Sequence, residues 1–149
     1  MAPRIITVVN VLLILLHAVL LAINYSEFPA KVPSHVGISG AIDAYEDKSF
    51  VFQIPVINAV IFLVLEFLRS KPHILNYGTP VTDRNRESMY KGMQLFISIL
   101  SFIVTAIFFS ISSYLYLSFN SIFLWLALSL MLVLYAVGTA LVTKKVAGK

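Results

Sequence analysis

The chain contains no cysteine and few charged residues. Without cysteine there is no disulfide, no thiolate nucleophile and no thiolate ligand for a metal. Only 12% of the residues are charged, whereas soluble domains typically carry about 25%. The apolar fraction of 59% and the mean hydropathy of +0.90 are correspondingly high. These values indicate an integral membrane protein, and 149 residues leave room for one such domain but not for a large soluble catalytic domain.

Four apolar runs are long enough to cross a bilayer as helices. They cover residues 5–23, 50–68, 93–117 and 122–142. A helix needs about 20 apolar residues to cross the hydrocarbon core, and it satisfies the backbone hydrogen bonds that lipid cannot. The first run exceeds the apolar core of a signal peptide, so we expect a retained span. We predict an all-α fold, a four-helix transmembrane bundle in one domain, with an ordered loop between its first two spans.

Basic residues gather on one side of this predicted bundle. One precedes the first span, five lie in residues 69–91 and three follow the fourth span, while residues 25–48 hold two lysines against four carboxylates. By the positive-inside rule, both termini and the loop 69–91 are cytoplasmic, and the loop 25–48 is extracytoplasmic. We therefore expect a cell-membrane protein whose main partner is the lipid bilayer, with no nucleic-acid partner. Tyr116 is among the aromatic residues expected at the outer interface.

Polar residues form stripes on two predicted spans. Asn10 and His17 are seven residues apart and lie near one face of the first span. The third span carries a second face of this kind, formed by Gln94, Ser98, Ser101, Thr105 and Ser112. Small hydroxyl residues allow helices to approach and to hydrogen-bond, so we expect both faces to pack inside the bundle. A membrane-buried His17 is also a candidate proton relay, although a neutral histidine bonded to a neighbour gives the same pattern.

An ion pair and a helix start are expected at the two ends of the cytoplasmic loop 69–91. Glu66 and Arg69 are three residues apart and are expected to pair near the membrane surface. Thr82 is the expected N-cap of the third helix, with Asp83 in its first turn. The basic residues set topology and touch anionic lipid, and a cytoplasmic regulator is a further possible partner.

The outer loop 25–48 admits three interpretations. As a metal site it offers His35 and Asp43, whereas structural zinc generally has more histidine or cysteine ligands. As a catalytic site it offers His35 as general base and Lys48 as electrostatic stabiliser, with no nucleophile spaced beside them. As a structural or recognition loop, it holds a Lys48–Asp43 ion pair and a His35 bonded to a backbone carbonyl. We favour the third interpretation, which requires no cofactor and no enzymatic activity.

A family resemblance rests on this same loop. Its signature positions are Pro29, Val32, Pro33, His35, Gly40, Asp43, Tyr45 and Lys48. The stretch resembles the domain of unknown function at the N-terminus of SdpI-type immunity proteins, and the loop 69–91 is similar in its Asn-Tyr and Pro-Val-Thr motifs. The resemblance implies a bacterial or archaeal multi-pass membrane protein. Some relatives protect a producing cell from its own secreted peptide toxin.

Our leading hypothesis is a non-enzymatic membrane protein whose outer loop recognises or excludes a peptide toxin or another membrane-active compound. Its extracytoplasmic ligand would be a peptide or a lipid. One alternative is a small transporter or membrane enzyme that uses His17 or the cluster of His35 and Asp43. Another is a structural accessory subunit of a larger assembly.

Overall fold

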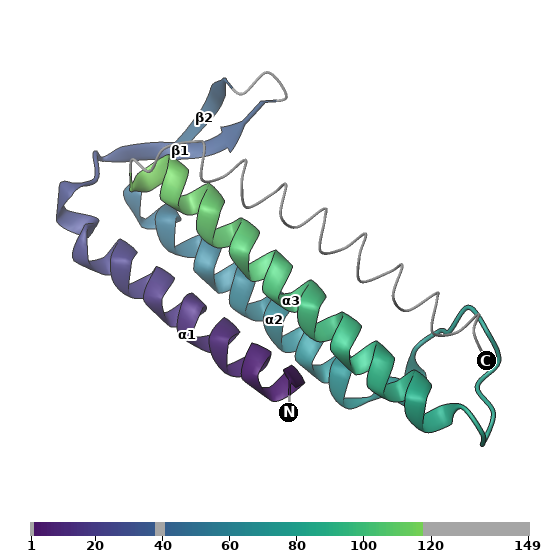
Figure 1. The fold of residues 1–149 in the computed structure, drawn as a ribbon. Coiled ribbons are helices and arrows are strands. Elements are labelled where there is room, and N and C mark those ends of the chain that lie inside the picture. The colour runs from purple at the N-terminus through teal and green to yellow at the C-terminus, as the bar shows by residue number, and fades with distance from the viewer. Residues whose placement is uncertain (1, 38–40, 118–149) are drawn as a thin grey trace.

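The computed structural model describes residues 2–37 and 41–117, which form three long helices and a β-hairpin (Figure 1). The helices are α1 (Ala2–Ile23), α2 (Gln53–Ser70) and α3 (Arg86–Tyr116). The hairpin strands are β1 (Lys31–Val36) and β2 (Ile42–Asp47). Short 3-10 turns connect these elements: η1 (Tyr25–Glu27), η2 (Lys48–Phe52) and η3 (Pro72–Ile74). The predicted fourth span, residues 122–142, lies outside the described residues.

The three helices lie side by side, with α2 antiparallel to α1 and α3 (Figure 1). Each helix is long and apolar enough to cross a membrane. Their outward faces carry exposed aliphatic side chains such as Leu12, Leu15 and Leu63, whereas Asn10 and Ser101 are buried between them. Polar residues inside and apolar residues outside reverse the usual arrangement of a soluble domain. The structure therefore indicates a membrane-embedded protein.

The bundle has two distinct ends. The hairpin end is where α1 and α3 finish and α2 begins, and β1 and β2 lie across it (Figure 1). The opposite end is where α1 and α3 begin and α2 finishes. In sequence, the three helices correspond to the first three predicted spans.

The all-α expectation is wrong for the outer loop, because much of it forms an antiparallel hairpin. Lys31 pairs with Asp47 at its base, and the register shifts on either side of the pairing between His35 and Ala44. At each shift, two residues of one strand lie opposite a single residue of the other strand, as in a β-bulge. Pro33 lacks an N–H group and is tolerated in a strand beside such an irregularity. Bulges and prolines hide the alternating pattern by which a strand is recognised in sequence.

A small hydrophobic core attaches the hairpin to the helices. Leu21 of α1, Val32 of β1 and Val51 of η2 are almost fully buried, and Tyr116 of α3 packs with them. The Tyr116 hydroxyl donates a hydrogen bond to the Pro33 carbonyl, 2.8 Å away. Tyr116 thus lies beneath the hairpin, at the end of the bundle that the sequence predicts to be the outer one.

The third helix begins three residues later than predicted. Asn85 precedes its first residue, Arg86, and the Asn85 side-chain oxygen accepts a hydrogen bond from the Thr82 backbone N–H. Thr82 is therefore the start of a turn before α3 and not its N-cap. The Tyr77 and Tyr90 rings pack against each other at this end, 5.9 Å apart. Burial, followed by the influence of Tyr90, raises the pKa of the Tyr77 hydroxyl.

Candidate functional site

A line of buried polar side chains runs through the interface of the three helices. Asn10 of α1 donates a hydrogen bond to the Ser101 hydroxyl of α3, 3.1 Å away. Further along, the Thr105 hydroxyl donates to Asn58 of α2 at 3.4 Å. Hydrogen bonds across helices in this setting typically contribute about 1 kcal/mol each. These contacts join α3 to both of its neighbours.

His17 lies nearer the hairpin end of this line and is fully buried. Its ring packs edge-on against Phe109, with 5.3 Å between the ring centroids. Neither ring nitrogen has a hydrogen-bond partner within the described part of the chain. The buried hydroxyls of Ser112 and Ser113 are likewise unpartnered there. The expected bond from His17 to a neighbour is therefore not among the described contacts.

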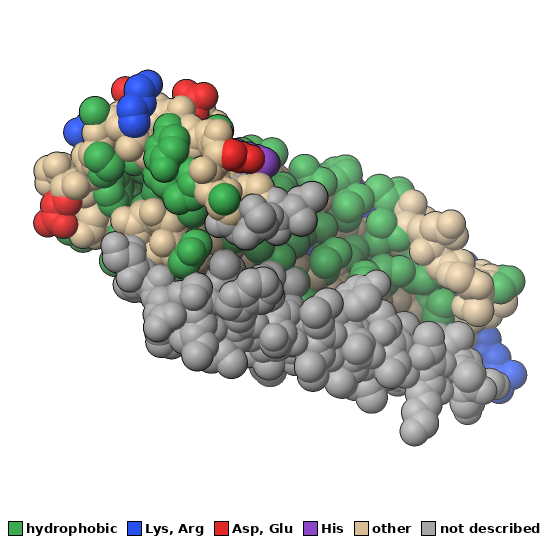
Figure 2. All heavy atoms as spheres, turned by 90° about the horizontal axis from the view of Figure 1, so that it is seen from above, with side chains coloured by type: hydrophobic (Ala, Val, Ile, Leu, Met, Phe, Trp, Pro, Cys, Tyr) green, Lys and Arg blue, Asp and Glu red, His purple; other side chains and the backbone are tan. Residues whose placement is uncertain are grey.

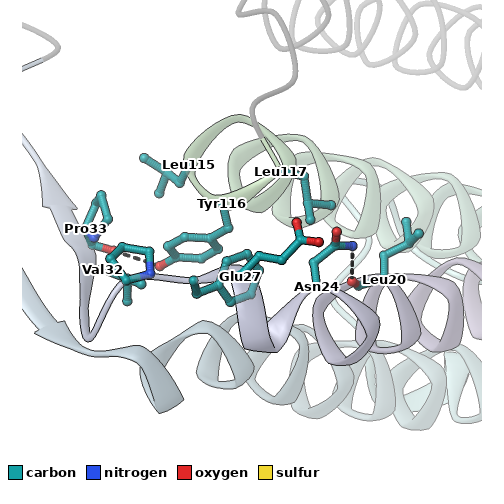
Figure 3. Close-up of a pocket in the computed structure, with 10 residues that line it drawn as sticks. Leu20, Asn24, Glu27, Val32, Pro33, Leu115, Tyr116 and Leu117 are labelled. Atoms are coloured by element: carbon teal, nitrogen blue, oxygen red, sulfur yellow. Dashed lines mark hydrogen bonds between the residues drawn. The ribbon is translucent and has the colours of Figure 1, made fainter.

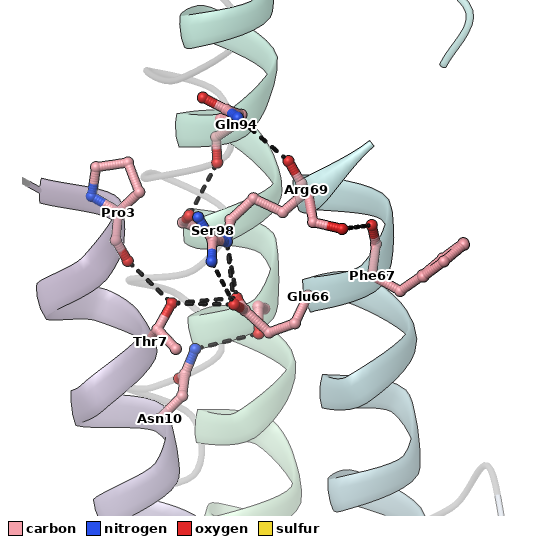
Figure 4. A network of polar contacts seen from close by, with 10 residues as sticks. Pro3, Thr7, Asn10, Glu66, Phe67, Arg69, Gln94 and Ser98 are labelled. Atoms are coloured by element: carbon pink, nitrogen blue, oxygen red, sulfur yellow. Dashed lines mark hydrogen bonds and ion pairs between the residues drawn. The ribbon is translucent and has the colours of Figure 1, made fainter. Parts of the chain in front are cut away.

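A polar network fills the interface near the opposite end (Figure 4). Arg69 pairs with Glu66 at 2.6 Å, and both side chains are largely buried. The Thr7 hydroxyl of α1 lies 3.2 Å from both oxygens of the Glu66 carboxylate. Gln94 donates to the Arg69 carbonyl at 3.4 Å, and the Ser98 hydroxyl donates to the Gln94 carbonyl. The predicted Glu66–Arg69 pair is thus present, and it also joins α1 to α2.

On the hairpin, His35 pairs with Asp43 across the bulged region. The His35 Nδ1 atom and the Asp43 Oδ1 atom are 2.5 Å apart, and both side chains are mostly exposed. The Asp43 carboxylate also lies close to the backbone of Gly37. A Cβ atom at position 37 would be 3.2 Å from Asp43 Oδ2, so a larger residue there would require the carboxylate to shift slightly. The predicted Lys48–Asp43 pair is therefore wrong, and so is the predicted bond from His35 to a backbone carbonyl.

Lys48 instead contacts an aromatic ring at the base of the hairpin. Its ammonium nitrogen lies 4.6 Å from the centroid of the Tyr25 ring, a cation–π geometry. The neighbouring Asp47 carboxylate accepts a hydrogen bond from the Ser49 backbone N–H, and this bond lowers the Asp47 pKa. Lys48 lies beyond the end of β2, four residues along the chain from Ala44, the strand partner of His35. The structure does not bring His35 and Lys48 together as a catalytic pair.

Within the described residues, no third ligand joins His35 and Asp43 at the predicted metal site. His35 and Asp43 are adjacent, but no group of three or more His, Cys, Asp or Glu side chains in residues 2–37 and 41–117 is placed to hold a metal ion. Two other signature residues also lie in the hairpin. The Pro33 carbonyl accepts the hydrogen bond from Tyr116, and Tyr45 is exposed on β2. Gly40 lies outside the described residues.

A cavity of about 430 Å³ lies between the hairpin and the helix ends (Figure 3). Its lining comes from the last turns of α1 and α3, from η1 and from β1: Leu20, Asn24, Glu27, Phe28, Pro29, Val32, Pro33, Leu115, Tyr116 and Leu117. Pockets of about 300 to 1,000 Å³, mostly apolar with a few polar groups, are typical small-ligand sites. The volume of this cavity falls within that range, and its lining combines apolar and polar side chains.

Charged side chains gather at the hairpin end, beside an apolar helix surface (Figure 2). Residues 25–48 carry four carboxylates and two lysines, although the chain as a whole has a formal charge of +4. The region around the cavity is thus acidic within a basic protein. Such an imbalance favours the approach of cationic ligands.

Sequence reasoning missed three of these residues. Asn58 is an amide in the middle of the apolar run 50–68, and the reasoning applied to Asn10 would have identified it. Thr7 was not distinguishable, because its contact depends on how α1 is rotated against α2. Glu27 was counted only as charge, although it lines the cavity.

The comparison with protein families identifies part of the chain. Residues 12–59 match a family model described as a domain of unknown function, DUF1648. The match includes the hairpin and parts of α1 and α2, so it confirms a domain of unknown function there, whereas the SdpI-type resemblance stays a prediction. No curated protein and no solved structure shows a significant match to the chain.

Proposed function

We propose that the chain is a multi-pass cell-membrane protein of SdpI type, whose hairpin end faces outward and recognises or excludes a peptide toxin or another membrane-active compound. The observation that carries this proposal is the cavity between the hairpin and the ends of α1 and α3. Its lining joins aromatic and aliphatic side chains to the Glu27 carboxylate, which suits an amphipathic ligand. The polar hairpin around it supplies a rim.

The His35–Asp43 pair supports the proposal because it fixes the bulged part of the hairpin. A cell that expresses the chain should tolerate a cognate toxin better than the same cell without it. Asp43→Ala removes the partner of His35 and should reduce this protection roughly tenfold in inhibitory concentration, the effect of about 1.4 kcal/mol of binding energy. Growth inhibition across a panel of peptide toxins measures the effect at matched protein levels.

Asp83→Ala is the matched control, because Asp83 is also an exposed, paired carboxylate but lies before α3 at the opposite end. Cells that express the Asp83→Ala variant should tolerate the toxin as well as cells that express the unchanged chain. Equal sensitivity with and without the chain across the whole panel would rule out the recognition function.

A second candidate function is proton transport through the helix interface, and it is favoured by the environment of His17. His17 is fully buried, and both ring nitrogens lack partners among the residues that the structure describes. Intramembrane ionisable residues commonly mark proton or ion paths. This function predicts proton flux into liposomes that contain the purified protein. His17→Ala should abolish the flux, and His73→Ala, at an exposed histidine in η3, should not. A flux-inactive unchanged protein would eliminate this candidate.

A further inference from the structure

We propose that the cavity at the hairpin end binds an alkylammonium group, that is, a positively charged amine joined to a short apolar chain. This inference rests on the proposed recognition function and names the chemistry of its ligand. It follows from the described lining of the cavity, in which Glu27 is the one charged side chain and the polar side chains offer more acceptors than free donors.

Two of these side chains already donate to backbone carbonyls (Figure 3). The Asn24 amide nitrogen donates one of its two protons to the Leu20 carbonyl at 2.8 Å, which leaves one N–H group and the amide oxygen of Asn24. The Tyr116 hydroxyl donates its one proton to the Pro33 carbonyl at 2.8 Å. The prolines of the lining have no N–H group. A ligand that brings donors is therefore matched to more groups of the lining than one that brings only acceptors.

The one charged side chain of the described lining, the exposed Glu27, favours a ligand with positive charge. Glu27 lines the cavity with an ionisable carboxylate, which accepts hydrogen bonds and donates none when charged. In the described part of the chain, no hydrogen bond or ion pair is formed by this carboxylate. An ammonium group provides both charge and donors, so it satisfies Glu27 and Asn24 together.

The remaining lining suits an ammonium group that carries an apolar chain. Phe28 and Tyr116 pack with 6.2 Å between their ring centroids, and aromatic faces attract cations. The same end of the molecule already shows this contact between Lys48 and Tyr25. Aliphatic side chains complete the walls: Leu20, Val32, Leu115 and Leu117. They provide an apolar surface for the carbon chain.

The test is calorimetric titration of the purified full-length chain, in micelles of a nonionic detergent, with n-octylammonium. Neutral n-octanol and anionic octanoate are the matched probes. We expect octylammonium to bind at least roughly tenfold more tightly than either, because only it carries a positive charge that can pair with Glu27. Equal affinity for octylammonium and octanol on the unchanged chain would overturn the proposal without any variant.

Glu27→Gln should weaken octylammonium binding roughly tenfold and leave octanol binding unchanged. Glu46→Gln is the control, because it makes the same charge change on exposed β2 outside the cavity lining. Equal weakening by the two variants would overturn the proposal, since the effect would then reflect overall charge. Circular dichroism and thermal unfolding check that both variants fold.

Competition identifies the natural source of the ammonium group. Displacement of octylammonium by an amidated Leu-Lys-Leu peptide, and not by dihexanoyl phosphatidylethanolamine, supports a peptide ligand. The reverse pattern supports the same ammonium site with a lipid headgroup as occupant, and it separates this inference from toxin recognition. If the chain gives no protection from toxins but octylammonium binding depends on Glu27, the proposed recognition function is wrong and the ammonium site is supported.

Discussion

Leu21→Ala should lower the free energy of unfolding by about 2 to 5 kcal/mol, the usual cost of removing a large aliphatic side chain from a packed core. Leu21 has no exposed surface and packs with Val32, Val51 and Tyr116, which attach the hairpin to the helices. The cavity left behind should loosen the hairpin before the helices separate. Thermal unfolding in detergent, combined with hydrogen exchange of residues 31–47, measures both effects.

Ile23→Ala is the control for this prediction. It removes a side chain of similar size from the same end of α1, but Ile23 is 70% exposed in the described fold. Its loss should be well below that of Leu21→Ala, because little packing is removed. Equal losses for the two variants would show that the hairpin is not attached through Leu21.

Glu66→Gln should lower the free energy of unfolding by about 2 to 3 kcal/mol, because it leaves the Arg69 charge without its partner. The Glu66 and Arg69 side chains are only 17% and 21% exposed. Glutamine keeps the size of the side chain and an acceptor for Thr7, so the change isolates the charge. Chemical or thermal unfolding in detergent measures the loss.

Glu87→Gln provides the comparison, since Glu87 forms a pair with Lys91 whose side chains are 82% and 72% exposed. Exposed pairs contribute roughly 0 to 1 kcal/mol, so this variant should be close to the unchanged protein. If Glu66→Gln were equally mild, the charge pair between Glu66 and Arg69 would contribute little to stability despite its burial.

Much of the helical framework was predictable, because length and hydropathy are local properties of the chain. The spacing of Ser98, Ser101 and Thr105 predicts one face of α3, and the structure buries these residues between helices. A period read from one helix indicates which face is buried. It does not indicate the partner on the next helix, so the bond between Asn10 and Ser101 required the structure.

The hairpin end was the least predictable part. Its two register shifts and Pro33 interrupt the alternation that marks a strand. Tyr116 ends an apolar run, where a tyrosine is typical of the membrane interface, and only the folded hairpin above it shows that its hydroxyl is bonded to Pro33. The cavity follows from this contact between residues far apart in sequence. The side chains that line it therefore gave no local signal of a shared cavity.

Recognition of an extracellular ligand requires the hairpin to face outside the cell, and the absence of native cysteine permits a direct measurement. Glu46→Cys places a thiol on exposed β2, and Arg84→Cys places one in the exposed turn before α3. In intact cells a membrane-impermeant maleimide should label the cysteine at position 46, and it should label the cysteine at position 84 only after permeabilisation. The reverse pattern would place the hairpin and its cavity in the cytoplasm and contradict recognition at the outer face.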